Sequence, residues 1–558
     1  MNSRYIILLV LFLSSAVSCK KDYLTEKPEA IIAPDNLYVN KAGFESGLYG
    51  LYNQWRIERR GITNSANDIT STAAVIGVDN AYSLYPAGGA AESVFNDFGV
   101  RMNASDGYIS AFFNYLYSMI NAANTIIGRS ENSSINWTET EKNQIVAEAR
   151  LLRAWAYRHL TYLWGDVPLT LEESKGNNIK TDWERAPVAE VRKAMEEDLL
   201  FAEANLPSVP AIEGRASKVV AQHYLAELYL TIGENQKAKD KALAVTQSPD
   251  YKLITARYGV RKALPGTPFT DMFIDKNSNR SEGNTEVLWT MQNEYLSTGG
   301  DVNIMRRWWV NRYNTIRVGN KNPITYSKEN GGRGLGRFAV TKYAFNLYGP
   351  TDDRGSAFAW RFYFIINNPA SLPTGSQAVA TCAAPAYTGG KIGDTVKLSI
   401  NCNEPAPSAT TAQNWPNPTK WDWAPDDVND VQNTSNYNDQ IYLRLGETYL
   451  LLAEAQFKLG DAAGAAITIN ALRNRAKATP AIAADINISF ILDERSRELI
   501  TEEHRRYTLI RTGTWFDRTK LYNKYSGPRI IARDSLLPIP QSVIDANLTS
   551  KMRQNPGY

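Results

Sequence analysis

Apolar residues follow a helical period in two blocks of the chain, which are separated by a long stretch without one. The first block runs from about 37 to 246 and the second begins near 441. Within 187–205, one helix face collects residues three or four apart: Val188, Val191, Met195, Leu199 and Ala202. Pro187 at the start and Pro207 just past the end bound this segment. Both blocks are therefore predicted to be helical.

Two stretches share an order of small and turn residues that is typical of a tetratricopeptide (TPR) helix pair. The first stretch, 222–245, contains Leu225, Ala226, Tyr229, Gly233, Ala238 and Ala242. The second, 449–472, contains Leu452, Ala453, Gln456, Gly460, Ala465 and Ile469. Glycine suits a left-handed turn between helices and alanine a close helix approach, and such pairs must stack to bury their faces. Unrelated amphipathic hairpins are the alternative.

The stretches 65–107 and 253–438 are dense in Gly, Asn, Ser, Pro and aromatic residues and lack long periodic runs. They are predicted to be elaborated loops. Short strands are expected at 286–291 and 395–400, where apolar and β-branched residues are frequent. Loops carried by a rigid scaffold are where binding sites usually lie.

The N-terminus has the pattern of a secretory signal that ends at a cysteine. Arg4 precedes an apolar run from Tyr5 to Leu13, and small residues lead to Cys19. The run is too short to span a bilayer of about 30 Å. Cleavage before Cys19 leaves a residue that can carry acyl chains, as in bacterial lipoproteins. An ordinary signal peptide with an incidental cysteine is the alternative.

Composition excludes several classes of function. Lys and Arg total 61 against 58 Asp and Glu, so a nucleic-acid partner is not expected. The histidines His159, His223 and His504 lie far apart, each within a helical pattern, which argues against a metal centre. Cys382 and Cys402 are the pair that remains besides Cys19, so we expect either a disulfide or two free thiols.

Several strings resemble the SusD/RagB family of outer-membrane lipoproteins of Bacteroidetes. They begin with the helix 147–157 and its exit turn 163–169. They continue with 214–218, 442–449 and 494–504, and end with 537–541 and 554–557. The resemblance covers the chain from Cys19 to its last residue, with the motifs in the family's order.

This resemblance implies an all-α dominated fold, a TPR-like helical repeat scaffold with a long loop-rich insertion containing short strands. The implied organisation is a signal peptide at 1–18, a tether at 19–36, helical regions at 37–252 and 441–558, and a ligand-facing insertion at 253–440. It further implies a cell-surface, outer-membrane, lipid-anchored protein that is not an enzyme and has no cofactor. Such a protein captures oligosaccharides for a SusC-type TonB-dependent transporter; the RagB-like branch captures peptides instead.

Two loops combine aromatic rings with polar groups, the mixture that sugar binding needs. The predicted contacts in the first loop are Asp79, Asn80, Tyr82, Tyr85 and Asn96. Those in the second are Arg306, Trp308, Trp309, Asn311 and Tyr313. Core packing is the alternative for these aromatics. If Trp308 and Trp309 lie in a strand, only one of them can face a ligand.

The remaining charged clusters have structural interpretations. Glu494 is spaced to pair with Arg497, and Glu502 with Arg505 or Arg506, as surface or inter-helix ion pairs. The acidic stretch 426–430, with Asp422 nearby, offers oxygen ligands that suit Ca²⁺, although its spacing is not that of an EF-hand. A solvated acidic turn is the alternative.

Overall fold

The computed structural model describes residues 33–61, 72–84, 94–96, 98–176, 178–295, 297, 300, 304–399, 401–407, 415–422 and 437–558. The predicted signal peptide, Cys19, Tyr85 and the acidic stretch 426–430 therefore lie outside the described residues. Within them, no helix is both long and apolar enough to cross a membrane.

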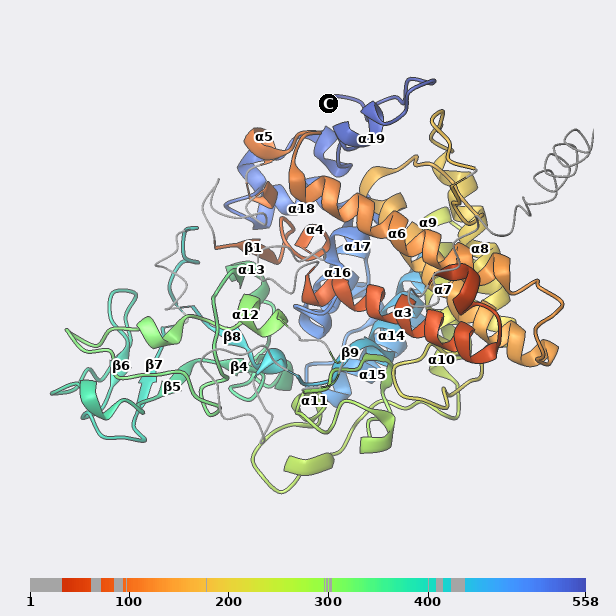
Figure 1. Cartoon of the computed structure of the whole chain (residues 1–558). Helices are drawn as coiled ribbons and strands as arrows, with labels where there is room; N and C mark the ends of the chain where they lie inside the picture. The colour runs from red at the N-terminus through yellow and green to blue at the C-terminus, as the bar shows by residue number, and fades with distance from the viewer. Residues whose placement is uncertain are drawn as a thin grey trace, which may run out of the picture.

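Helices stacked side by side form the scaffold of the molecule, and the insertion lies beside them (Figure 1). The N-terminal helices are α2 (Pro34–Leu37), α3 (Lys41–Arg60), α4 (Thr72–Val75), α5 (Phe98–Arg101), α6 (Gly107–Arg129), α7 (Glu139–Trp164), α8 (Val188–Asn205), α9 (Lys218–Ile232) and α10 (Asn235–Thr246). The C-terminal helices are α14 (Leu445–Lys458), α15 (Ala462–Arg475), α16 (Ile488–Leu499), α17 (Arg505–Arg511), α18 (Trp515–Tyr522) and α19 (Gln541–Asp545).

The predicted helix pairs form and stack in one series. Helix α7 packs on α8, α8 on α9, and α9 on α10. Helix α10 then packs on α14, which in turn packs on α15, so the two helical regions join directly. Gly233 and Gly460 each adopt φ of +83° at the turns within the pairs α9/α10 and α14/α15. Only glycine adopts this conformation without strain, which is why these turns contain it.

The insertion contains short helices and paired strands joined by long loops. Its helices are α11 (Pro268–Asp271), α12 (Met305–Trp309) and α13 (Lys342–Phe345). Strand β3 (Phe338–Val340) pairs with β1 (Ala81–Ser83) of the N-terminal region, β2 (Val287–Met291) pairs with β9 (Gln440–Arg444), and β4 (Trp360–Arg361) pairs with β8 (Asn417–Pro418). Strands β5 (Tyr363–Ile365), β7 (Thr395–Lys397) and β6 (Ala386–Tyr387) form an antiparallel sheet in that order.

Strand β9 anchors the insertion because it leads directly into α14. Its partner β2 carries Trp289, whose ring stacks on Trp55 of α3 with centroids 3.9 Å apart. Tyr442 of β9 meets both rings edge to face. The β5–β7–β6 sheet has a separate small core around Tyr313, Phe364 and Val396, and it projects away from the helices (Figure 1).

Candidate functional site

The second predicted ligand loop is buried, which contradicts its interpretation as a stacking platform. Trp308 and Trp309 are each 1% exposed and lie in the short helix α12 rather than in a strand. Both rings pack against Phe338, with centroids 4.4 and 5.2 Å away. Tyr313 is fully buried and stacks on Phe364 at 4.7 Å. These aromatics therefore form core and present no face to a ligand in this structure.

The polar residues of that loop are enclosed as well. Arg306 is 0% exposed, and burial lowers the pKa of its guanidinium to about 9, with the neighbouring Arg307 adding to the effect. The side-chain amide of Asn311 donates a hydrogen bond to the backbone carbonyl of Trp415. Both are therefore structural in this arrangement rather than ligand contacts.

The first predicted loop is likewise part of the scaffold. Asp79, which is 0% exposed, is held by the guanidiniums of Arg505 at 2.7 Å and Arg518 at 2.8 Å. The other side chains have equally local partners: Asn80 donates to Ser496, Asn96 bonds the backbone of Ser83 through both amide atoms, and Tyr82 donates to the carbonyl of Pro405. Asp79 and Asn80 thus tie the loop to α16, α17 and α18, Tyr82 ties it to the insertion, and Asn96 holds the loop to itself. These four buried side chains are structural in this arrangement rather than ligand contacts.

The charged motif 494–506 is buried, so the surface interpretation of its ion pairs is wrong. The predicted pair of Glu494 with Arg497 forms at 2.7 Å. Glu502 instead pairs with Lys420 and with Arg444, whereas Arg505 binds Asp79. Arg506 donates to the backbone carbonyl of Asp534. Apart from this one local pair, the charged side chains named here are thus held by partners far away in the sequence, on other elements.

Glu498 is the centre of this buried network. Its carboxylate accepts from Arg354, Arg444 and Arg475, and all four side chains are nearly inaccessible to solvent. Burial alone would raise the pKa of Glu498, but the three guanidiniums hold it well below its usual value. The network joins α16 to α15, to β9 and to the insertion.

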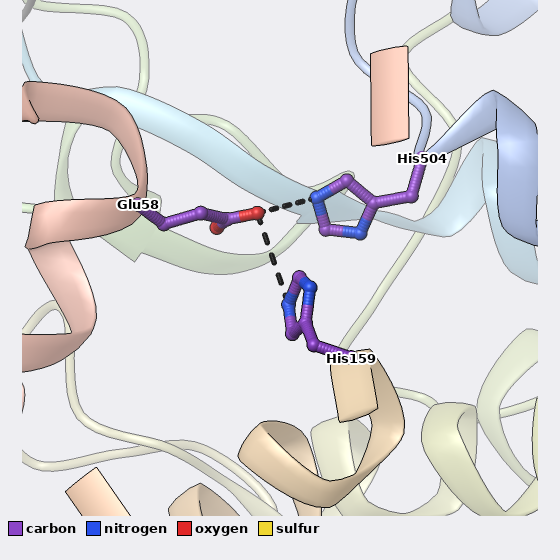
Figure 2. A group of neighbouring side chains, drawn as sticks. All are labelled: Glu58, His159 and His504. Atoms are coloured by element: carbon purple, nitrogen blue, oxygen red, sulfur yellow. Dashed lines mark ion pairs between the residues drawn. The ribbon is translucent and has the colours of Figure 1, made fainter. Parts of the chain in front are cut away.

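Two of the three histidines meet around Glu58, although they are far apart in the sequence (Figure 2). His504 Nε2 lies 2.6 Å from Glu58 Oε1, and His159 Nε2 lies 3.9 Å from it. Arg158 donates to His504 Nδ1, so His504 Nε2 carries the proton and donates to Glu58.

This cluster is built for hydrogen bonding rather than for a metal. A protonated Nε2 has no lone pair to offer. In addition, 2.6 Å is shorter than the separation of about 3.4 Å between two ligands that each lie about 2.1 Å from a tetrahedral ion. Tyr442 donates to the second oxygen of Glu58 at 2.7 Å. The cluster therefore links α3, α7 and β9 to the start of α17.

A cleft of about 390 Å³ opens among four segments of the insertion: 261–274, 328–329, 357–363 and 419–422. Two aromatic side chains in its lining are unusually accessible, since Phe358 is 45% exposed and Tyr363 is 40% exposed. Sugar-binding clefts place such rings against the C–H face of the ligand. We refer to this feature as the insertion cleft.

Polar and charged groups surround the two rings. Arg361 donates to the carbonyl of Glu329 at 2.9 Å and forms an ion pair with Asp422. Burial raises the pKa of Asp422, while Arg361 acts in the opposite direction. Thr270 and Thr419 add hydroxyl groups to the lining. Apolar rings beside hydroxyl, carboxylate and guanidinium groups form a surface to which polyhydroxylated ligands are complementary.

Two family models match the chain. The one described as the SusD family matches residues 269–558, which is more than half of the chain. The chain belongs to the SusD family. The other model, described as starch-binding associating with outer membrane, matches residues 62–230 of this SusD-family protein. The family resemblance noted in the motifs is therefore confirmed.

Similar proteins and structures span nearly all of this chain. The SusD-like proteins P2 and P25 of Formosa agariphila are each 26% identical over the full length of both chains. A laminarin-binding SusD-like protein has the same fold, with a TM-score of 0.69, 20% identity, and coverage of 93% of this chain and 100% of that one. Surface glycan-binding protein A from Bacteroides fluxus also has this fold, with a TM-score of 0.64 and 18% identity. The match covers 92% of this chain and 99% of that one.

The sequence did contain a signal for the cleft of this SusD-family chain. Residues 358–364 include five aromatics, and in an extended chain Arg361 and Tyr363 fall on the face opposite Trp360 and Phe364. The structure buries Trp360 and Phe364 at 1% and 0% exposure and leaves Tyr363 accessible. This alternation indicates Arg361 and Tyr363 as the accessible face, whereas Phe358 lies in the preceding turn and has no such signal.

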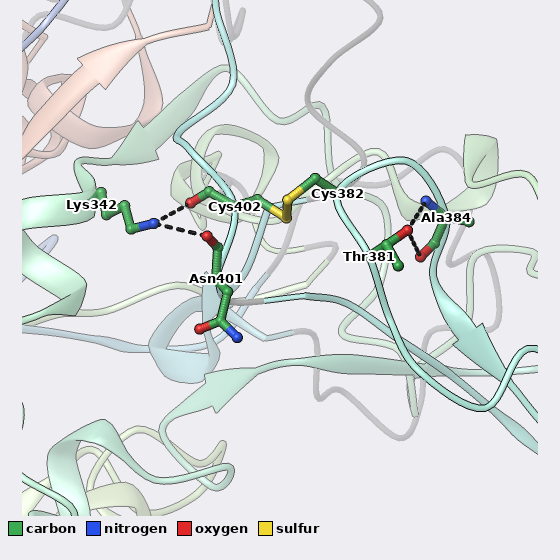
Figure 3. The surroundings of a disulfide bond; sticks show 6 residues. All are labelled: Lys342, Thr381, Cys382, Ala384, Asn401 and Cys402. Carbon is green, nitrogen blue, oxygen red and sulfur yellow. Dashed lines mark hydrogen bonds between the residues drawn. A yellow bond between two sulfur atoms is a disulfide. The ribbon is translucent and has the colours of Figure 1, made fainter.

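A second cavity, of about 360 Å³, lies beside the disulfide of this protein. Cys382 and Cys402 are bonded, with Cα atoms 5.3 Å apart, as in the first of the two predicted alternatives. Lys342 donates to the carbonyls of Asn401 and Cys402 at 3.0 and 2.7 Å (Figure 3). The bond thus closes the projecting β6–β7 hairpin, and Lys342 ties that end to α13.

Proposed function

We propose that this SusD-family protein binds glycan in the insertion cleft and delivers it to a SusC-type TonB-dependent transporter at the cell surface. The observation that supports this most directly is the pair of accessible rings, Phe358 and Tyr363, set among polar groups in a 390 Å³ space. The family membership supports a binding role rather than catalysis. The peptide-binding function of the RagB-like branch is the alternative.

The binding site is tested by removing the two rings separately. Truncating an aromatic anchor commonly costs about 2 kcal/mol of binding free energy, or roughly thirtyfold in affinity. Phe358→Ala and Tyr363→Ala should therefore weaken binding while the melting temperature stays constant. Tyr49→Ala is the matched control, because Tyr49 is 51% exposed on α3, outside the cleft.

The measurement is isothermal titration against laminarin, starch, xylan and a mixture of peptides. Glycan binding that both cleft variants weaken and Tyr49→Ala leaves unchanged supports the proposal. Equal affinity in the parent and both cleft variants would place the site elsewhere. Binding of peptides alone would favour the RagB-like function, and release of shorter sugars would show an enzyme.

The lipid anchor at Cys19 is tested by membrane fractionation. Cys19 becomes the N-terminal residue if the signal is cleaved before it, and several buried acyl chains hold a protein at a membrane essentially permanently. Cys19→Ser should move the protein from the detergent-extractable outer-membrane fraction to a soluble one. Undiminished membrane retention of the variant would rule out this anchor.

A further inference from the structure

One short segment forms part of the insertion cleft on one side and contacts the helical scaffold on the other. It comprises β8 and the single 3₁₀ turn Thr419–Trp421 that follows. Thr419 and Asp422 line the cleft. Lys420 and Trp421 point away from it and are only 8% and 6% exposed. The segment can therefore transmit the position of the scaffold to the cleft.

On the cleft side, the segment is bonded to residues 358–361, which belong to another of the lining segments. Thr419 donates its amide to the carbonyl of Ala359 at 3.0 Å and its hydroxyl to the carbonyl of Phe358 at 2.8 Å. Asp422 holds the guanidinium of Arg361. The backbone that carries the Phe358 ring, and the charged pair beside it, thus both depend on where residues 419–422 lie.

On the scaffold side, Lys420 uses all three of its ammonium protons. It donates to the carbonyls of Glu498 and Ile500, both at 3.1 Å, and to the carboxylate of Glu502. Trp421 Nε1 donates to Thr501 Oγ1 at 2.8 Å. All four acceptors belong to the end of α16 and the turn before α17. Thr501 adopts φ of +67°, which is strained for a β-branched residue and requires surrounding contacts to hold it.

Lys420 also contacts one residue that lines the cleft. Its ammonium lies 5.0 Å from the centre of the Phe273 ring, and Phe273 lines the cleft. Phe269 lies on the same cation at 5.1 Å. A cation over aromatic rings is attracted to them, more strongly when it is desolvated.

We infer that Lys420 and Trp421 are positioning residues of the binding site, which hold the ligand-facing segment 419–422, and through it Phe358 and Arg361, against the turn between α16 and α17. Neither residue is part of the lining of the insertion cleft. The inference rests on the proposed function only in naming the cleft as the binding site, because the mechanical linkage is a property of the unliganded protein.

The linkage is tested first without any ligand, by hydrogen–deuterium exchange of the full chain. Lys420→Met keeps the aliphatic stem and removes the three hydrogen bonds. Local opening exposes backbone amides, so exchange at 358–361 and 419–422 should become about tenfold faster or more, while α9 and α10 stay unchanged. Trp421→Phe keeps an aromatic ring but removes the N–H donor and part of the buried indole, and it should produce a smaller change at the same amides.

Arg475→Met is the matched control. Arg475 is a buried cation on α15 that binds Glu286 and Glu498 of the same ion network, and it has no contact with 417–422 among the interactions described. It should lower the melting temperature without loosening the cleft. The inference is overturned if Lys420→Met and Trp421→Phe leave the cleft amides as protected as in the parent, or if Arg475→Met loosens them equally.

Binding of laminarin then separates this inference from the proposed function. If laminarin binds in the cleft, Lys420→Met should lower its affinity about tenfold, and this loss should shrink in the Phe358→Ala background, because both changes act through one ring. If laminarin does not bind but hydrogen–deuterium exchange changes as expected, the positioning role of Lys420 and Trp421 is supported. Laminarin is then not the ligand of the cleft. Binding that is lost on Phe358→Ala but unchanged by a loosened cleft overturns the positioning role.

Discussion

The helical scaffold and the insertion fill space to very different degrees. Among the described residues of the scaffold, a cavity between α7, α8 and α9 has a volume of about 10 Å³, near the least that can hold one water, and one between α3, α7 and residues 207–216 has a volume of about 110 Å³. The insertion borders cavities of about 390 and 360 Å³. Stacked helices bring side chains together at regular spacings and interlock them, whereas short strands joined by turns leave gaps. Accessible rings and hollows therefore gather where the backbone is irregular.

Both regions bury aromatic and charged residues, so composition alone does not distinguish them. The scaffold uses its buried charges to join distant elements, as Glu498 does with three arginines. The insertion buries Trp308 and Trp309 in core but leaves Phe358 and Tyr363 accessible. The comparison predicts that scaffold substitutions cost stability, and that cleft substitutions cost binding.

The largest effect is expected from Glu498→Gln. The change leaves three buried guanidiniums without their common carboxylate, which should reduce the free energy of unfolding by about 5 kcal/mol, the upper end for breaking a buried ion pair. Glu139→Gln is the control, because Glu139 forms an exposed pair with Lys142 and should cost less than about 1 kcal/mol. Urea denaturation measures both, and equal costs would show that the buried network does not stabilise the fold.

The next largest effect is expected from Trp308→Ala. Truncating a fully packed tryptophan should cost about 4 kcal/mol of stability, and any binding by the folded variant should be unchanged. Tyr363→Ala should show the opposite pattern. Thermal melting measures the stability of both variants, and isothermal titration measures their binding. A Trp308→Ala variant that melts like the parent but fails to bind would restore this tryptophan as a ligand contact.

Glu58→Gln should have an effect that depends on pH. Burial raises the pKa of Glu58, but the hydrogen bond and field of His504, together with the nearby His159 and the guanidinium of Arg59, outweigh this and lower it to about 2, from 4.5. A lowered carboxyl pKa stabilises the fold above about pH 4.5 and loses that contribution as pH falls toward 2. The shift corresponds to about 3 kcal/mol at pH 7. Urea denaturation should therefore show that Glu58→Gln reduces the free energy of unfolding less at pH 3 than at pH 7. An equal reduction at both pH values would contradict this prediction.

Sequence reasoning predicted the parts of the molecule that local patterns determine. Helical periodicity located the pairs, and Gly233 and Gly460 located their turns, because each depends on residues a few positions apart. The strand predicted at 286–291 is observed as β2, and that at 395–400 begins as β7.

The site could not be predicted in the same way, because burial depends on distant partners. Trp308 is core because Phe338 covers it, and Asp79 is structural because Arg505 lies against it, more than 400 residues along the chain. Neither contact has a signal in the local pattern. Similarly, His159 and His504 meet only once α7 and α17 pack around Glu58.

The smallest effect is expected from breaking the disulfide with Cys382→Ser and Cys402→Ser. A bond that closes a loop of this length contributes about 3 kcal/mol. In a chain of this size the entropy of unfolding is on the order of 1 kcal/mol per kelvin, so even that full amount would shift the melting temperature by only about 3 °C. We expect a smaller shift, because the β5–β7–β6 sheet has a core of its own, apart from the helical scaffold. Exchange should accelerate within 377–402 and stay constant in α7 and α14. A loss of cooperative unfolding in the helices would instead show that the insertion and the scaffold fold as one unit.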